Sequence, residues 1–593
     1  MGLCSYWTVA VPKKSPAEAM AEKWLFVLPM GSNFFARFDC IRFHRAWLCL
    51  ACCLVQFCAG SIYSFTLVAD DLDMFFSGTK TKQCMQALLL AYVCLGATAA
   101  LSGPFLERNG PRIGMTIGTV MVALGHIFAQ AGVMRKDLKW LMVAYGVCVG
   151  IGFGLLLITS ISTVQKWFPD LRGSVTGLAV IFFGIGNAVF IKAFSTFVAH
   201  NAVPRLFWET GQAAPYSSPP VSQRSSFTGV ATVVVLILCT LIIRTPPATF
   251  TVRGQDTHCV PVSRAPSPDL VQDEYLKIGM TFVNYSAVQS ELDGTDGHYF
   301  QQVKALSLMQ CIFSTDFVCM YIAFAACIMP IVIFIPQAQS MQGLLKIDNL
   351  TFMTYTYRTS MMSPFRLDLI RGMLALVANL SGRLCAPVIS DLLIRVCYAN
   401  PAFARKVVFV ALLAIECVAL FILPHHSHNA TTRQWLSNAL TFSSGGGLAL
   451  MPCFITDMFG VYNSGSMYGL IWTSWSLGAA ISWRQLDGAT LTMALYEAQL
   501  HWMLLLTATA LGLMLFVRTN SCDRFFYGYQ FSACDKILVQ VPFRRHLVRE
   551  DPILDSMSFT THTPRSHDAV PTDGFVLWSG EGSTGKYVRH VVT

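Results

Sequence analysis

Long apolar runs separated by short polar connections dominate the pattern of this chain. Each run holds about twenty residues, the length at which an α-helix crosses a ~30 Å hydrocarbon layer. A longer polar stretch divides the runs into two groups of six. The pattern predicts an all-α polytopic membrane protein with about twelve transmembrane helices in two six-helix bundles. The predicted spans are 46–69, 84–106, 113–133, 139–164, 173–199, 227–245, 308–336, 367–390, 407–424, 434–456, 464–484 and 499–518.

Three polar segments flank and divide these bundles, which we place at 46–245 and 306–518. The linker at 246–305 is rich in Pro, Ser, Thr, Asp and Gln, so we expect it to be mobile. The tail at 519–593 is polar and is expected to be largely disordered apart from a membrane-adjacent start. An even number of predicted crossings separates this tail, the linker and the tail at 1–45. All three are therefore expected on the cytosolic side.

The sequence gives partial support for this orientation. Lys and Arg near the helix ends are divided almost equally between the two sides, so the positive-inside rule decides little. The sequons at Asn349 and Asn429 would face outside, as glycosylation requires. The sequon at Asn284 would face the wrong side, and that at Asn379 would be buried in a helix.

The composition agrees with a membrane protein and excludes several other classes. Charged residues make up 13% of the 593 residues and hydrophobic residues 54%, whereas soluble domains carry about 25% charged residues. The net charge of +9 is modest and favours contact with a membrane surface over binding of nucleic acid. The twenty cysteines fall mostly singly within apolar runs, which indicates small core residues. The sequence contains no recognisable metal cluster, cofactor motif or nucleophile–base set, so we expect no enzyme activity and no cofactor. It also contains no ATP-binding loop, so we expect that transport is driven by a solute gradient or by exchange of one solute for another.

One short loop between two predicted spans carries the most specific motif. It reads Gly103-Pro-Phe-Leu-Glu107-Arg108-Asn-Gly110-Pro-Arg112 and must reverse the chain at a membrane surface. Gly103 permits close helix packing, Gly110 permits a tight turn, and the three charged residues are expected to form a small ionic lock. An ordinary charged turn is the alternative. The pattern G-x-x-x-(D/E)-R-x-G-x-R resembles the signature loop of the major facilitator superfamily, and this resemblance implies a role in gating.

The eighth predicted span ends in a related way. Pro387 is followed by Asp391 and Arg395, roughly where the signature loop closes the second span. We therefore expect Asp391 and Arg395 to belong to the same gating or structural motif in the second half of the chain.

A second motif narrows the resemblance to one branch of the superfamily. The stretch Lys166-Trp-Phe-Pro169-Asp-Leu-Arg172-Gly173 predicts a helix break at Pro169, with Lys166 and Arg172 facing an anionic surface. Together with 457–473 it is similar to the oxalate:formate antiporter branch, which is related to monocarboxylate transporters. The resemblance implies transport of a small organic anion, with a coupling proton or an exchanged anion as the second partner.

Arg383 is the most informative charge within a predicted span. A charged side chain in the hydrocarbon layer costs ~2.5–3.5 kcal/mol or more, so it should face the bundle interior or a watery cavity. Asn379 lies one turn earlier on the same face. In monocarboxylate transporters the corresponding arginine is taken to bind the substrate carboxylate, and an acid stands where this chain has Asn379. The resemblance thus implies a substrate site with Arg383 and Asn379, whereas a structural arginine that snorkels or pairs with Asp391 is the alternative.

Other polar residues within the spans carry weaker predictions. Lys192 either supplies a second positive group to the substrate site or snorkels to the interface. Asp316 and His126 are candidates for proton carriers, and Glu416 is expected to be structural. We expect a transporter of monocarboxylates or dicarboxylates in the plasma membrane or an organelle membrane. The alternatives are an amino-acid carrier, which could use Asp316 as a partner for the amine, and a transporter-like sensor or scaffold without flux.

Overall fold

The structure of this protein is a computed structural model, and its helices account for most of the described chain. The described residues are 6–7, 14–29, 35–78, 82–199, 228–247, 250–252, 257, 303, 306–345, 366–397, 399–425, 430–486, 492–519, 528–533, 536–542, 575–580 and 587–592. Most of the predicted linker lies outside these ranges, as do the sequons at Asn284, Asn349 and Asn429.

The N-terminal bundle begins with a helix that is interrupted once. α3 (Arg45–Ala59) and α4 (Ser61–Ser77) meet at Gly60, and a Cβ at this position would clash with the backbone of Phe183. Glycine therefore allows the first helix to approach the fifth closely. The remaining elements of this bundle are α5 (Gln83–Asn109), α6 (Pro111–Arg135), α7 (Leu138–Leu141), the π-helical η1 (Met142–Val149), α8 (Gly150–Trp167), the short η2 (Pro169–Leu171), α9 (Arg172–Ala199) and α10 (Thr228–Ile242).

The C-terminal bundle repeats this arrangement of long helices. A short α14 (Leu308–Ile312) precedes the first of them. Trp472 separates the two parts of the eleventh helical rod. The elements are α15 (Thr315–Leu345), α17 (Arg366–Val396), α18 (Pro401–Ile422), α19 (Ala430–Phe459), α20 (Val461–Ile471), α21 (Thr473–Leu486) and α22 (Met493–Leu515).

The described helices confirm the predicted fold class. Within the described ranges, nine helices are long and apolar enough to cross a membrane. α10 is a shorter apolar helix, while α18 carries three charged residues and the eleventh rod is divided. Every predicted span coincides with a described helix, although the helices extend further than the hydropathy runs, as α17 does beyond 390. The predicted helix break at Pro169 is also present, since α8 ends at Trp167.

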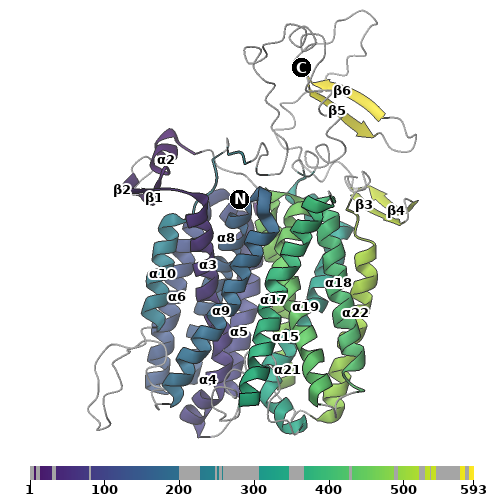
Figure 1. The fold of residues 1–593 in the computed structure, drawn as a ribbon. Coiled ribbons are helices and arrows are strands. Elements are labelled where there is room, and N and C mark those ends of the chain that lie inside the picture. Colours follow the sequence, from purple (N-terminus) through teal and green to yellow (C-terminus); the bar gives the residue numbers. More distant parts are fainter. Residues whose placement is uncertain are drawn as a thin grey trace, which may run out of the picture.

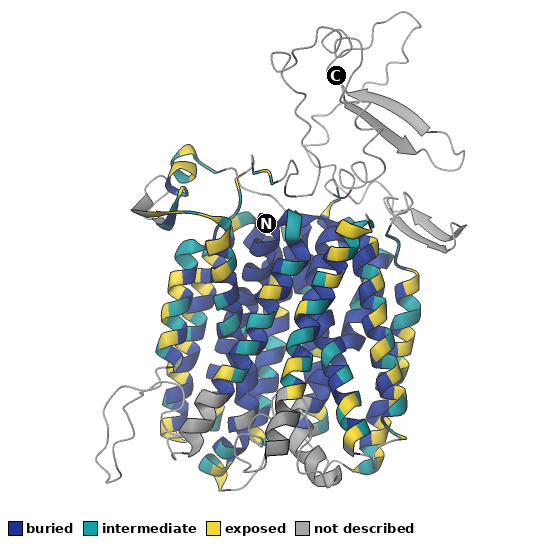
Figure 2. Cartoon of the chain, in the orientation of Figure 1, coloured by how far each residue is buried: buried dark blue, intermediate teal, exposed yellow. Residues whose placement is uncertain are grey.

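The two bundles stand side by side and contact each other along two seams (Figure 1). α9 packs against α17, and α5 packs against α20 and α21. Figure 2 shows buried residues where helices face one another and exposed residues on the outward faces. Large apolar side chains such as Leu505 and Phe421 are 69% and 61% exposed on these outward faces. Apolar outward faces are those of a protein surrounded by lipid, and the chain is an integral multi-pass membrane protein.

Small folded elements lie at one end of the bundles. α2 (Pro16–Ala21) and the antiparallel strands β1 (Trp24–Pro29) and β2 (Phe35–Arg42) cover the N-terminal bundle there (Figure 1). The C-terminal tail contains two further antiparallel pairs, β3 (Gly528–Ala533) with β4 (Lys536–Pro542) and β5 (Phe575–Gly580) with β6 (Tyr587–Val592). We call this the tail end of the bundles. The predictions of a cytosolic tail at 1–45 and a largely disordered tail at 519–593 did not anticipate these strands.

The orientation in the membrane remains a prediction with a direct test. An epitope tag placed within 246–305, or at either terminus, should be detected only after cells are permeabilised, because these segments are expected in the cytosol. A tag inserted after Asn429 should be detected on intact cells and serves as the matched control. Detection of the linker tag on intact cells would contradict the six-plus-six topology.

Candidate functional site

Arg383 lies in the middle of α17, between the two bundles. Its side chain is 1% exposed, and Nε donates a hydrogen bond to Asn379 Oδ1 at 2.8 Å. Nη1 donates to the carbonyl oxygen of Val180, across the seam with α9, at 3.0 Å. The predicted shared face of Arg383 and Asn379 is therefore present, and this face is turned toward the N-terminal bundle.

Asn379 is itself held in place by the neighbouring helix. Its Nδ2 donates to the carbonyl oxygen of Thr441 in α19 at 3.1 Å, which leaves Oδ1 free to accept from Arg383. Gly445 of α19 is the reason for this close approach, since a Cβ there would lie 2.7 Å from the Asn379 carbonyl oxygen. The amide thus orients the guanidinium without neutralising its charge.

Aromatic side chains surround the guanidinium of Arg383. Its Cζ lies 5.4 Å from the centroid of the Phe183 ring, a distance suited to a cation–π contact. Tyr63 packs edge-on against Phe183 at 5.3 Å and against Trp475 at 5.8 Å. Tyr92 from α5 joins the same group, with its ring 5.8 Å from that of Trp475. Rings from both bundles therefore form apolar walls beside one buried cation.

Two hydrogen-bonding groups within this aromatic region have no hydrogen-bond partner among the residues that the structure describes. They are the Tyr92 hydroxyl and the Trp472 indole nitrogen, and both atoms are buried. The Tyr468 ring lies edge-on to the Trp472 ring, with the centroids 6.0 Å apart. Buried polar groups are normally satisfied, so a ligand with hydrogen-bond acceptors would suit this region.

The charges of Asp391 and Arg383 are separate in the structure, which argues against the alternative that they pair. Asp391 binds Arg405 of α18, with Oδ1 2.6 Å from Nη2. It also accepts hydrogen bonds from the backbone of Gly173 and Ser174 at the start of α9, at 3.2 and 2.6 Å. An acid at a helix N-terminus stabilises the helix, so Asp391 ties α17 to the first turn of α9.

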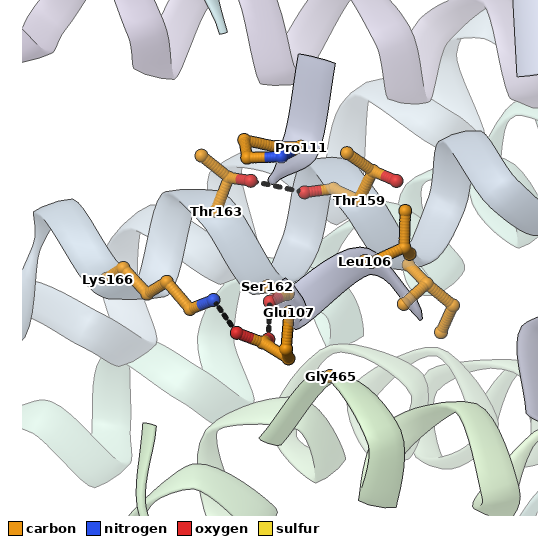
Figure 3. A pocket seen from close by; sticks show the side chains of 9 residues that line it. Leu106, Glu107, Pro111, Thr159, Ser162, Thr163, Lys166 and Gly465 are labelled. Atoms are coloured by element: carbon orange, nitrogen blue, oxygen red, sulfur yellow. Dashed lines mark hydrogen bonds and ion pairs between the residues drawn. The ribbon is translucent and has the colours of Figure 1, made fainter. Parts of the chain in front are cut away.

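A second group of charges lies around the signature loop at the tail end. Glu107 Oε2 is 2.5 Å from Lys166 Nζ, and Oε1 accepts from the Ser162 hydroxyl at 3.3 Å (Figure 3). This pair borders a small pocket between α5, α8 and Gly465 of α20. Gly103 touches Ser466 of α20, so the loop packs directly against the other bundle.

The arginines of the signature loop bind partners elsewhere in the chain. Arg108 donates to the Tyr6 carbonyl oxygen at 2.6 Å, and Arg112 lies 3.4 Å from Glu22. Each of the three charged residues expected to form the ionic lock thus takes a partner outside the loop. Their role in gating stays a prediction. The folded N-terminal segment supplies two of these partners, which hydropathy could not reveal.

Lys166 and Arg172 also differ from the prediction that they face an anionic surface. Both side chains are buried, and Arg172 pairs with Asp457 at the end of α19. Asp457 binds Arg405 as well, with Oδ2 3.1 Å from Nε. We call Arg172, Asp391, Arg405 and Asp457 the interbundle network, because it joins α9 to three helices of the C-terminal bundle.

A smaller set of contacts extends the interbundle network toward the surface. Arg45 forms two hydrogen bonds with the carboxylate of Asp170, at 2.9 and 3.3 Å. Arg395 donates to the carbonyl oxygen of the same residue. The predicted motif residues Asp391 and Arg395 therefore both reach across to the N-terminal bundle at the tail end.

The N-terminal segment is fastened to the tail end by Arg244, which follows α10. Arg244 donates to the carbonyl oxygens of Glu22 and Leu25 at 2.8 and 2.5 Å, and its own carbonyl accepts from the Trp167 indole at 2.8 Å. Burial lowers the pKa of Arg244 to about 10, with a further decrease from Arg112 that Glu22 opposes. The group therefore stays protonated at neutral pH and fixes the segment beside the signature loop.

The remaining predicted site residues either lie away from Arg383 or have side chains outside the described part of the chain. Asp316 binds Arg518, with Oδ2 3.0 Å from Nη2, at the start of α15. His126 is buried in α6, where Nδ1 lies 2.8 Å from the carbonyl oxygen of Val122. Lys192 belongs to α9, but its side chain lies outside the described part of the chain.

A two-bundle helical membrane protein with a buried cation between the bundles is built as a transporter. The sequence matches the family model of the Major Facilitator Superfamily over residues 48–482. The chain belongs to this superfamily, whose members carry small-molecule substrates across membranes.

Individual relatives are more distant. The oxalate:formate antiporter of Oxalobacter formigenes is 30% identical over 169 residues, which are 28% of this chain and 38% of that protein. Apicoplast pyruvate carrier 2 of Toxoplasma gondii is 28% identical over 200 residues, or 32% of this chain and 29% of that protein. The chain thus spans well under half the length of these curated relatives. A bacterial homologue of the iron transporter ferroportin shares the fold, with a TM-score of 0.50 at 10% identity over 80% of this chain and 98% of that one.

The pair between Glu107 and Lys166 provides a test of the signature loop. Glu107→Gln should lower turnover several-fold while the apparent affinity for substrate changes little, because the pair affects the balance between conformations and not the Arg383 site. Uptake rates across a substrate series give both quantities. The control is Glu497→Gln, which removes an exposed acid of α22 that has no part in the signature loop. A loss of affinity with unchanged turnover would contradict this role.

Proposed function

We propose that this protein transports a small organic anion, a monocarboxylate or a dicarboxylate, by alternating access of the two bundles. The observation that carries the proposal is Arg383: a buried guanidinium whose described polar partners, Asn379 and the Val180 carbonyl, are both neutral. A buried charge without a counter-ion is costly, and an anionic substrate would supply that counter-ion. The fork of the guanidinium matches the two oxygens of a carboxylate.

The surroundings of Arg383 support a compact substrate. The aromatic rings of Phe183, Tyr63 and Trp475 leave apolar walls beside the cation, and the unpaired donors of Tyr92 and Trp472 would meet acceptors beyond the carboxylate. Substrates such as pyruvate, lactate and oxalate combine a carboxylate with a further oxygen. The names of the relatives, an oxalate:formate antiporter and a pyruvate carrier, point to the same chemical class.

The two groups of charges at the tail end fit the gate that alternating access requires. Opening this end would separate Arg172 from Asp457 and Asp391 from the start of α9, while the Arg383 site would remain between the bundles. We propose that Gly103, Glu107, Arg108, Gly110, Arg112, Asp391 and Arg395 act in this gate, together with Lys166 and the interbundle network.

The amino-acid carrier is less well supported. It needs an acidic or polar partner for the substrate amine near Arg383, and Asp316 is instead engaged with Arg518 at the end of the bundle. A sensor or scaffold without flux would not need a buried cation between the bundles.

Uptake by the purified chain in lipid vesicles tests the proposal. Labelled formate, lactate, pyruvate, oxalate and amino acids would be offered with and without a pH gradient, against vesicles without protein. We expect one or more carboxylates to enter and the amino acids to be excluded. Entry of amino acids alone would favour the amino-acid carrier. Absence of any flux, together with intact binding of partners by the tails, would favour the sensor or scaffold.

A further inference from the structure

Glu416 of α18 is a buried acid that the transport site and the gate leave unexplained. Its side chain is 0% exposed, and among the described residues neither carboxyl oxygen has a hydrogen-bond partner. Two other buried acids of this chain are paired with cations: Glu107 binds Lys166 and Asp316 binds Arg518. The expectation of a structural role, formed from sequence, therefore lacks the partner that such a role requires.

In the described part of the chain, no charged side chain is recorded in contact with Glu416. On its own helix, Leu412 and Leu413 belong to one apolar cluster and Ala419 and Leu420 to another, so the acid lies where the two meet. α22, which packs against α18, carries no titratable side chain between 502 and 515. On α17, Arg383 is turned toward α9 and Asn379. Asp391 and Arg395 of the same helix are engaged with Arg405 and Asp170 at the tail end.

A thiol on a neighbouring helix contacts Glu416. Cys327 of α15 contacts the carboxyl group, but its single proton is donated to the carbonyl oxygen of Ser443 at 3.6 Å. The Ser443 hydroxyl in turn donates to the carbonyl oxygen of Leu412 at 2.8 Å. These donors are occupied, so a carboxylate at 416 would be an unpaired charge in apolar surroundings, whereas a protonated acid could donate to the Cys327 sulfur.

Five residues of α19 connect this acid to the transport site. The stretch Ser443-Ser-Gly445-Gly-Gly447 is in contact with Asn379 and Arg383 through Gly445 and with Cys327 through Gly447. Glycine within a helix costs about 1 kcal/mol relative to alanine, so this part of α19 is easily deformed. A shift of Arg383 on binding an anion would therefore alter the packing around Glu416.

We propose that Glu416 is a proton-binding site coupled to the anion at Arg383. The acid holds its proton in the conformation described here, which is closed at the tail end, and releases it when rearrangement of α19 admits water. Glu416 lies six residues before the end of α18 at Ile422, about 9 Å along the helix, so the proton would enter from the end opposite the tails. This inference rests on the proposed function and assigns it an anion–proton symport.

Vesicle transport of pyruvate by three versions of the full chain tests the coupling. With one pH unit across the membrane, acid outside, the wild-type chain should accumulate labelled pyruvate about tenfold, as one-to-one symport requires. Glu416→Gln, which mimics the protonated acid, should keep pyruvate exchange near the wild-type rate but lose accumulation. The control Glu497→Gln alters an exposed acid of α22 and should accumulate pyruvate as the wild type does. Wild-type accumulation by Glu416→Gln would overturn the proposal.

Infrared spectroscopy tests whether Glu416 is protonated, and it needs no substrate. At neutral pH the wild-type chain and Glu497→Gln should show the carbonyl band of a protonated carboxylic acid that Glu416→Gln lacks. Absence of a difference would overturn the proton site. If no carboxylate is exchanged by the wild type, the proposed function fails while this band still reports on Glu416.

Discussion

Replacing Arg383 with alanine is expected to remove most carboxylate transport while the protein still inserts into the membrane. Hydrogen bonds to charged groups contribute about 1.5–3 kcal/mol each. Loss of a bidentate contact between the guanidinium and the substrate carboxylate should therefore weaken substrate binding at least about a hundredfold. Insertion should persist because the partners that remain, Asn379 and the Val180 carbonyl, are neutral. Flux and surface abundance must be measured on the same cells.

The lysine variant separates charge from geometry at this site. Arg383→Lys should restore part of the flux, because it returns a positive charge but not the planar fork. If the role of Arg383 were purely structural, the opposite result would be expected. The alanine variant would be degraded, and any surviving protein would transport normally. Near-normal flux per molecule in the alanine variant would remove Arg383 from the site and make Lys192 the next candidate.

Removing the shared acid of the interbundle network should have the largest effect on stability. Asp457 lies between Arg172 and Arg405, and all three side chains are 3% exposed or less. Asp457→Asn leaves two buried cations with weaker partners, and breaking a buried pair costs about 3–5 kcal/mol. We expect a clear fall in Tm in detergent, with any remaining transport shifted toward the conformation open at the tail end.

A neighbouring pair provides the comparison for this variant. Asp170→Asn removes the partner of Arg45. The Asp170 side chain is 2% exposed but that of Arg45 is 27% exposed, so water reaches the cation and the loss should cost less than that of Asp457. Equal changes in Tm for the two variants would show that the interbundle network does not hold the bundles together in the way proposed here.

The fold could be predicted from sequence because the membrane imposes it. Backbone groups in lipid must bond within helices, so each apolar run specified one helix, and the signature loop identified the family. The break at Pro169 and the shared face of Arg383 and Asn379 followed from local rules of the same kind. These rules hold whatever the neighbouring helices are.

The partners of charged residues depend on tertiary contacts, and the sequence did not reveal them. Lys166 and Arg172 resemble residues that face lipid headgroups, yet they are buried against Glu107 and Asp457. The separation along the chain is 59 residues in the first pair and 285 in the second, so no local spacing signals them. Arg112 likewise binds Glu22 of the N-terminal tail, for which the sequence predicts a cytosolic location and no contact with the loop.

The most direct measurement compares a carboxylate with its amide in the same vesicles. Pyruvate and lactate would each be tested against pyruvamide and lactamide as competitors of labelled uptake. The amides keep the shape and the second oxygen but lack the negative charge that Arg383 is proposed to bind. The account predicts that unlabelled carboxylates abolish uptake and that amides at equal concentration leave it unchanged. Equal competition by the amides would contradict recognition of an anion by Arg383.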